Sequence, residues 1–166
     1  ILEENIYSFN PHIVICLGQA GGRDKITVER VAINIDDARI ADNKNNSPID
    51  EPIRKDGETA YFSTLPIKAL VAELTKNNIP AAISNTAGTF VCNHIMYEIL
   101  YLSKTKFNNI SAGFIHIPYI REQVKNKPDT PFMELEMIIN ALKIIIETSA
   151  EFYQRNDIKI TGGYEH

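Results

Sequence analysis

His12-Ile13-Val14-Ile15-Cys16-Leu17 is a short apolar run closed by Gly18, and it predicts a buried β-strand. Similar short runs recur along the chain, at 31–35, 81–84 and 112–117. Apolar residues at helical spacing predict helices that alternate with these strands, over about 66–76, 93–103 and 132–152. This alternation predicts an α/β fold, a three-layer α/β/α sandwich with a largely parallel, open central sheet.

Length and composition limit the class of protein. The chain has 166 residues, of which 44% are hydrophobic and 23% charged, so we expect residues 1–166 to form a single folded domain. The net charge of −4 lacks the basic surplus that binding to nucleic-acid phosphates requires. Every apolar run is far shorter than the roughly 20 residues of a membrane span. We therefore expect no nucleic-acid partner and no membrane attachment.

The glycine-rich loop at 18–23 does not fit the common nucleotide-binding patterns. The dinucleotide fingerprint would need glycine at Ala20 and Arg23, and a phosphate loop would need Gly-Lys at Arg23 and Asp24. We interpret these glycines as a tight turn after the first strand. The four histidines lack zinc-site spacing, and two cysteines cannot build a structural zinc site, so we expect no metal and no cofactor.

Cys92 is the residue that most strongly indicates chemistry. It follows the turn at 88–91 and directly precedes a helical pattern, which places it at a helix N-terminus. Unpaired N–H groups and the helix dipole there stabilise a thiolate, and the same N–H groups can bind an oxyanion. The alternative is a small apolar core residue, the usual state of a free cysteine. Cys16 lies within a strand, and we expect it to be such a core residue.

A nucleophilic cysteine needs a base, and His116 is the best-placed histidine. It lies near the carboxyl end of a predicted strand, where sites form in open parallel sheets, so we expect it to meet Cys92 across adjacent strand ends. His94 is two residues from Cys92 and points to a different helix face. A buried histidine bound to a backbone carbonyl is equally compatible with the pattern at position 116. The pattern does not choose among four candidates for an orienting acid, Glu29, Asp36, Asp37 and Asp42.

Six ordered stretches carry a resemblance to a known family. They are LGQAGGR (17–23), ERVAIN (29–34), DARIADN (37–43), AYFSTLP (60–66), SNTAGTFVCN (84–93) and GFIHIPY (113–119). Together they resemble the pyroglutamyl peptidase I family of cysteine peptidases, in its bacterial form. The resemblance implies a catalytic triad of Glu29, Cys92 and His116. It also implies the remaining site residues: Ile40, Phe90 and Val91 as apolar walls for the pyrrolidone ring, Gln19 as a hydrogen-bond partner of the ring amide, and Arg39 beside the oxyanion region.

The resemblance further implies a cytoplasmic cysteine exopeptidase that removes N-terminal pyroglutamyl residues from peptides through a thioester. The resemblance also implies that this enzyme needs no cofactor and forms a homotetramer in bacteria. The family begins with a strand and a Phe-x-Pro-Phe-Gly-Gly motif that also walls the pocket. This chain instead opens at Ile1 in a helical pattern, so we expect its natural N-terminal part to be missing. The alternatives are a pyroglutamyl-peptide binder impaired by an incomplete pocket, and a different thiol acyl transfer such as an amidase.

Overall fold

A four-stranded sheet forms the centre of the computed structural model, which describes residues 1–163. Its order is β1 (Ile13–Gln19), β6 (Ser111–Ile117), β2 (Ile26–Glu29) and β5 (Ala81–Ser84). The outer pairs β1–β6 and β2–β5 are parallel, and the central pair β6–β2 is antiparallel. The predicted α/β class with a mostly parallel, open sheet is therefore confirmed.

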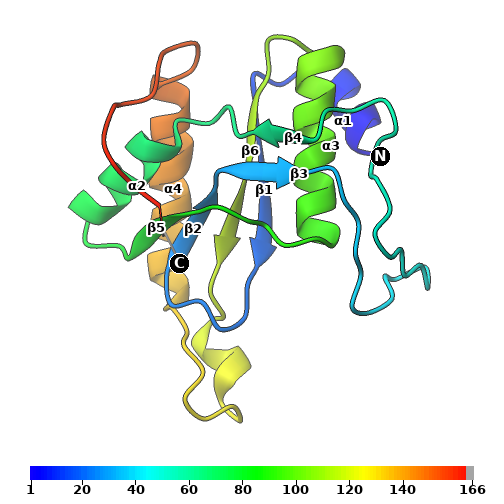
Figure 1. Cartoon of the computed structure of the whole chain (residues 1–166). Coiled ribbons are helices and arrows are strands. Elements are labelled where there is room, and N and C mark those ends of the chain that lie inside the picture. The colour runs from blue at the N-terminus through cyan, green and yellow to red at the C-terminus, as the bar shows by residue number, and fades with distance from the viewer. Residues whose placement is uncertain (164–166) are drawn as a thin grey trace.

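Helices cover both faces of this sheet (Figure 1). On one face lie α1 (Leu2–Phe9) and α3 (Val91–Thr105), and on the other lie α2 (Ile67–Lys76) and α4 (Leu135–Glu151). Alternate side chains of β1 enter the two resulting cores, because successive strand residues point to opposite faces. The predicted three-layer arrangement is therefore present.

The sequence missed one central strand and misplaced another. Residues 31–35 were expected in the main sheet, but β3 (Val31–Ile33) pairs with β4 (Ala60–Phe62) in a separate two-stranded sheet. The strand that does enter the main sheet is β2, which has only four residues and alternates apolar with polar side chains. All four are buried because β2 has a strand on either side and a helical layer over each face. Such a short alternating segment is difficult to separate from a loop by pattern alone.

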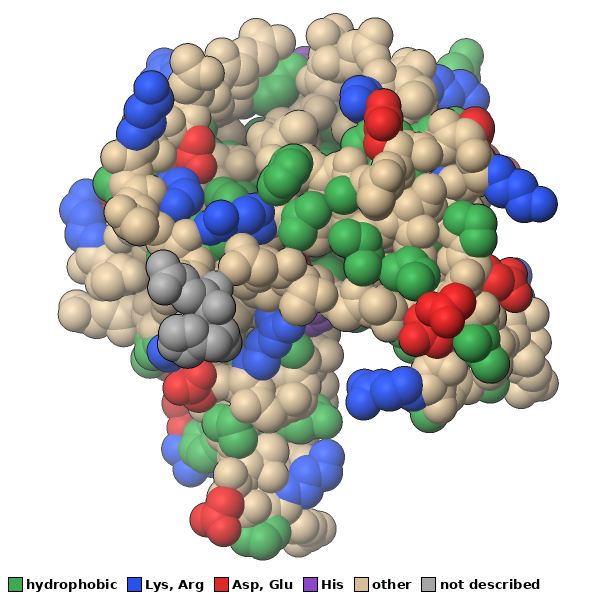
Figure 2. All heavy atoms as spheres, viewed as in Figure 1, with side chains coloured by type: hydrophobic (Ala, Val, Ile, Leu, Met, Phe, Trp, Pro, Cys, Tyr) green, Lys and Arg blue, Asp and Glu red, His purple; other side chains and the backbone are tan. Residues whose placement is uncertain are grey.

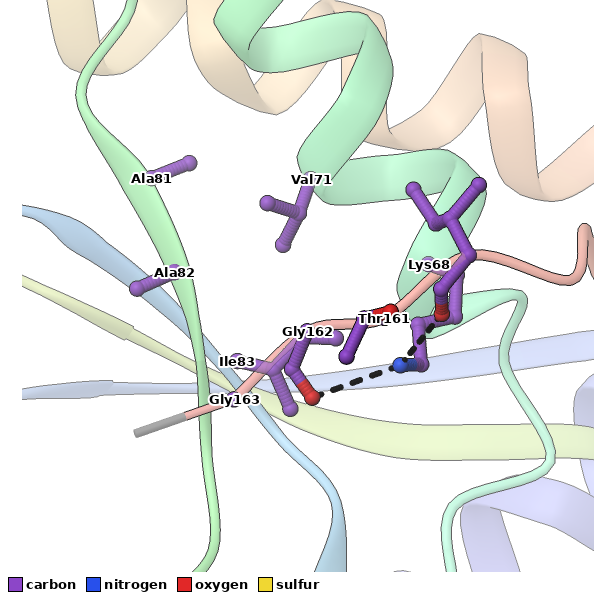
Figure 3. Close-up of a pocket in the computed structure, with 9 residues that line it drawn as sticks. Lys68, Val71, Ala81, Ala82, Ile83, Thr161, Gly162 and Gly163 are labelled. Atoms are coloured by element: carbon purple, nitrogen blue, oxygen red, sulfur yellow. Dashed lines mark hydrogen bonds between the residues drawn. The ribbon is translucent and has the colours of Figure 1, made fainter. Parts of the chain in front are cut away.

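The C-terminal tail from Asn156 is polar in sequence, yet its described residues pack against the body of the protein. The carboxylate of Asp157 accepts hydrogen bonds from the backbone N–H groups of Lys68 at 2.8 Å and Ala69 at 3.0 Å, and so caps the start of α2. The Lys68 ammonium donates to the carbonyl of Ile160, and the tail lines one side of an open pocket of about 220 Å³ beside β5 (Figure 3). Residues 164–166 of this tail lie outside the described residues.

The connection between β6 and α4 projects from the body of the molecule. It contains the short 3₁₀ helix η1 (Arg121–Val124), and Figure 2 shows a hollow between this projection and the surface beside it. Across residues 1–163, every helix is too short or too polar to span a lipid bilayer.

Candidate active site

Cys92 lies in the first turn of α3, as the sequence predicted. The residue that precedes this helix, Phe90, has no side-chain oxygen and makes no capping hydrogen bond. The N–H groups of the first turn therefore receive no cap from that side chain. These groups and the positive end of the helix dipole favour negative charge at this position, on a thiolate or on an oxyanion.

Gly18 makes room for the thiol at the end of β1. A Cβ atom at position 18 would lie 3.1 Å from Cys92 Sγ and 2.7 Å from the ring of Phe114. Any side chain there would have to displace the thiol or a ring that is itself fully buried. The glycine that ends the first apolar run is therefore part of the site as well as of the strand.

His116 and Glu29 lie on the face of the sheet that α3 covers. The antiparallel register places Thr27 opposite His116, and Glu29 is its diagonal neighbour on the same face. His116 Nδ1 lies 2.7 Å from Glu29 Oε1, and the two side chains are 5% and 0% exposed. This contact singles out Glu29 among the four candidate acids. His116 is thus bound to a carboxylate and not to a backbone carbonyl.

The electrostatics of His116 favour the imidazolium. Burial is the largest single influence on the pKa of His116 and lowers it. Hydrogen bonds to the side chains of Cys92 and Glu29, with the attraction of these two groups, outweigh burial and raise the pKa overall. By contrast, burial raises the pKa of the Cys16 thiol to about 11, so this cysteine stays protonated and unreactive near neutral pH.

The route by which Cys92 reaches His116 differs from the predicted one. Strand β2 lies between β5 and β6, parallel to β5 and antiparallel to β6. The strands β5 and β6 therefore run in opposite directions, and their carboxyl ends lie at opposite ends of the sheet. The expectation of adjacent strand ends was therefore wrong. Instead, the segment that follows β5 crosses in front of the sheet and begins α3 on its far side, beside β1 and β6 (Figure 1).

The remaining candidate acids lie elsewhere. Asp36 Oδ2 is 2.7 Å from Nδ1 of His94, whose side chain is 46% exposed, so His94 belongs to a separate surface pair. Asp37 is held through its backbone, which exchanges hydrogen bonds with Thr89. Asp42 accepts hydrogen bonds from the backbone of its own turn.

An open pocket of about 500 Å³ borders Cys92. Its lining includes four of the predicted site residues besides the cysteine: Arg39, Ile40, Phe90 and Val91. Gln19 does not line this pocket. Its carboxamide exchanges hydrogen bonds with that of Gln123, at 2.6 and 2.9 Å, although its neighbour Gly18 packs against the thiol.

Arg23 is the site residue that the sequence analysis left without a role. Its Nη1 lies 2.7 Å from Glu29 Oε1, the same oxygen that His116 contacts. The available signal was an arginine within a glycine-rich loop, six residues before the acid. Among residues 1–163, no group of three or more histidine, cysteine, aspartate or glutamate side chains is arranged to hold a metal ion.

A thiol at a helix N-terminus, beside an imidazole that a buried carboxylate holds, is the arrangement of a cysteine hydrolase on an α/β fold. The sequence matches the family model described as pyroglutamyl peptidase over residues 1–152, and the chain belongs to this family.

Sequence relatives and solved structures agree with this assignment. A pyrrolidone-carboxylate peptidase of Clostridium perfringens is 59% identical over 162 residues, which cover 98% of this chain and 75% of the relative. One of Streptococcus pneumoniae is 54% identical over 166 residues, covering 100% of this chain and 77% of the relative. The crystal structure of pyroglutamyl peptidase I from Bacillus amyloliquefaciens superposes with a TM-score of 0.92 at 49% identity, over 96% of this chain and 75% of the other. The pyrrolidone carboxyl peptidase from Thermococcus litoralis gives 0.93 at 44% identity, with 96% and 76% covered.

Proposed function

We propose that the chain removes the N-terminal pyroglutamyl residue from peptides, with Cys92 as nucleophile, His116 as proton carrier and Glu29 as the orienting acid. The observation that carries this proposal is the 2.7 Å contact between His116 Nδ1 and the buried Glu29 carboxylate, with Cys92 close enough to His116 to raise the pKa of the imidazole, in a member of the pyroglutamyl peptidase family. Because Nδ1 faces Glu29, the other ring nitrogen, Nε2, is the one available to the thiol.

The reaction follows from these positions. His116 takes the proton of Cys92, and the thiolate attacks the carbonyl carbon that joins pyroglutamate to the next residue. The resulting oxyanion lies near the N–H groups of the first turn of α3. Protonated His116 gives its proton to the leaving amine, the C–N bond breaks and a thioester remains. His116 then takes a proton from water, whose oxygen attacks the thioester carbonyl. The C–S bond breaks, pyroglutamate is released, and His116 returns the proton to the Cys92 thiolate.

The pocket suits a neutral, compact ring. A pyroglutamyl end has no charged amine, so the site needs no carboxylate to anchor one. Ile40, Phe90 and Val91 offer the apolar wall that such a ring requires, and Arg39 supplies a cation at the same pocket. For Gln19 we propose a hydrogen bond to the ring amide, which requires that its carboxamide exchange Gln123 for the substrate.

We further propose a homotetramer in the cytoplasm. Helix α4 carries an apolar stripe on its outer side, in which Leu135, Ile139 and Ile146 are 52%, 44% and 60% exposed. These residues share one helix face, and exposed stripes of this kind often mark subunit contacts. The reducing cytoplasm suits an enzyme that depends on a free thiol. Sedimentation equilibrium of the wild type and of Ile139→Glu tests the assembly, because a charge on this stripe should dissociate it.

Hydrolysis of a pyroglutamyl chromogenic substrate by two cysteine variants tests the proposed reaction. Cys92→Ala should abolish hydrolysis, whereas Cys16→Ala should keep most of it, because only the first removes the nucleophile. Equal losses in two folded variants would contradict the assignment. If the wild type binds pyroglutamyl peptides without hydrolysing them and its Cys92 resists alkylation, the alternative of a binding protein is correct.

A further inference from the structure

The glycine-rich loop between β1 and β2 delivers one side chain to the buried acid. Gly22 has a φ of +90°, a conformation that side-chain-bearing residues rarely adopt, and a Cβ atom on Gly21 would lie 2.4 Å from the hydroxyl of Tyr119. The conformation at Gly22 therefore favours glycine, and the absence of a side chain at Gly21 lets the loop pack directly against Tyr119. The next residue along the loop is Arg23, whose side chain reaches β2.

The guanidinium of Arg23 binds three residues on two separate segments. Its Nη1 donates to Glu29 Oε1 at 2.7 Å and to the hydroxyl of Thr27, both on β2. Its Nη2 donates to the carbonyl of Thr86 at 3.4 Å, on the segment that leads to Cys92 and α3. One planar group thus links the acid to the segment that carries the thiol. Only arginine has a fork of donors that can do this.

Within the described residues, Arg23 is the one side chain besides His116 that binds the Glu29 carboxylate. Its oxygen Oε1 accepts from both His116 and Arg23, while Oε2 is buried and has no hydrogen-bond partner within the described residues. With His116 as its only partner, the carboxylate could rotate together with the imidazole. Arg23 is itself held by Thr27 and Thr86, so it supplies a fixed point against which the carboxylate and then the imidazole are aligned.

Charge balance points to the same role. The Glu29 side chain is 0% exposed, and a buried carboxylate is costly without a compensating cation. With Arg23 present, the four groups Arg23, Glu29, His116 and Cys92 sum to zero charge. The sum is the same whether the proton is on the thiol or on the imidazole.

We propose that Arg23 is a positioning residue for the thiol reaction: it aligns Glu29, and through Glu29 the imidazole of His116, for proton transfer with Cys92. This inference rests on the proposed function of the Cys92–His116 pair. Arg23 does not line the pocket beside Cys92, so it acts through Glu29 and not on the substrate. The glycine-rich loop, whose pattern fits no nucleotide, thereby has a function as the support of this arginine.

A double-mutant cycle on the full chain tests the proposal. The variants are Arg23→Gln, Arg23→Lys, Glu29→Ala and the double variant Arg23→Gln with Glu29→Ala. Arg54→Gln is the matched control, because Arg54 forms a two-point ion pair with Glu98, at 2.7 and 2.8 Å, away from this site. The readouts are kcat and KM on a pyroglutamyl chromogenic substrate, the rate of Cys92 alkylation by iodoacetamide, and the thermal unfolding midpoint.

We expect Arg23→Gln to lower kcat by roughly 10- to 100-fold, the scale of a small misplacement of a reacting group, while KM changes by less than about 3-fold. Arg23→Lys should recover part of this loss, because lysine keeps the charge but not the fork. In the Glu29→Ala background, which removes the group that Arg23 and His116 share, Arg23→Gln should cost less than about 2-fold more, because its effect passes through the carboxylate. Arg54→Gln should lower the unfolding midpoint and leave kcat and KM unchanged.

Two results would overturn the proposal. One is a double variant whose loss equals the product of the two single losses, which would mean that Arg23 acts independently of Glu29. The other is an Arg23→Gln variant that unfolds at a lower temperature but keeps its kcat, as expected of a purely structural ion pair. The rate of Cys92 alkylation can be measured in the same variants without any substrate, so it tests the coupling between Arg23 and Glu29 independently of peptide cleavage. A wild type that alkylates rapidly but does not cleave pyroglutamyl peptides would therefore refute the proposed function and not the role of Arg23.

Discussion

Replacing Glu29 by glutamine isolates the charge of the buried acid from its shape. The glutamine oxygen can still accept from His116 and Arg23 in place of Oε1, and its NH₂ group would occupy the position of Oε2, which has no partner within the described residues. The hydrogen bonds that align the imidazole therefore survive the substitution. The negative charge that stabilises the imidazolium is lost.

The magnitude follows from the chemistry of the thiol and from the neighbouring arginine. In serine triads, neutralising the orienting acid costs about 10⁴-fold in turnover. A cysteine ionises near pH 8.5 without help, so we expect a smaller loss, roughly 10- to 1000-fold in kcat/KM. This loss corresponds to about 1.4–4 kcal/mol of transition-state stabilisation. Arg23 already offsets part of the Glu29 charge, which favours the lower half of this range.

The sign of the pH effect follows from the pKa of His116, which the hydrogen bond to Glu29 raises. Loss of this charge lowers the pKa of His116, so the alkaline limb of the kcat/KM profile should move to lower pH. The weaker imidazolium stabilises the thiolate less, so the acidic limb should move up. The bell-shaped profile therefore narrows from both sides.

Measurement of kcat/KM between about pH 5 and 10 in wild type and Glu29→Gln tests this reasoning, since the limbs report the ionising groups of the free enzyme. His116→Ala should lose more activity than Glu29→Gln at every pH. His94→Ala is the matched control, because His94 also pairs with a carboxylate but on the surface. An unshifted or rising alkaline limb in Glu29→Gln would refute the reasoning. A folded His94→Ala as damaged as His116→Ala would show that the base is misassigned.

Further predictions concern packing, stability and metal dependence. Gly18→Ala should lower kcat/KM by at least about 10-fold and destabilise the fold by about 1–3 kcal/mol, because the new methyl group overlaps the Phe114 ring and crowds Cys92 Sγ; wild-type kinetics in a folded variant would contradict this. Asp157→Ala should lower the free energy of unfolding by about 1 kcal/mol through loss of the α2 cap and leave kcat unchanged, as denaturant titration and initial rates can check. Iodoacetamide should abolish hydrolysis and a chelator should not, whereas chelator inhibition that added zinc reverses would show a metal requirement.

The sequence predicted the elements with long apolar patterns and failed where polar residues face the interior. The runs at β1, β5 and β6 and the helices α2, α3 and α4 were predicted within a few residues. Strand β2 was missed because Thr27 and Glu29, which face the site, interrupt its apolar pattern. The antiparallel central pair was also missed, because a parallel and an antiparallel neighbour leave the same pattern in a fully buried strand.

The site residues also differ in how far the sequence alone predicts them. The position of Cys92 at a helix N-terminus could be predicted, because turns and helix starts have sequence signals, but the pattern left open whether the cysteine is a nucleophile or a core residue. The choice of Glu29 over Asp36 depends on strand register, which the pattern did not give, and it came only from the family resemblance. Arg23 escaped notice because its role depends on where the glycine-rich loop leads. The structure brings Glu29 and Arg23 to His116, while the catalytic roles remain predictions.

Direct observation of the thioester tests the central claim. Wild-type protein should be mixed with excess pyroglutamyl substrate, quenched in acid within the first turnovers and measured by intact mass and peptide mapping. We predict a mass increase of one pyroglutamyl group on the peptide that contains Cys92, present also in Cys16→Ala and absent in Cys92→Ala. Hydrolysis that continues in Cys92→Ala, or an adduct found on Cys16, would contradict the account.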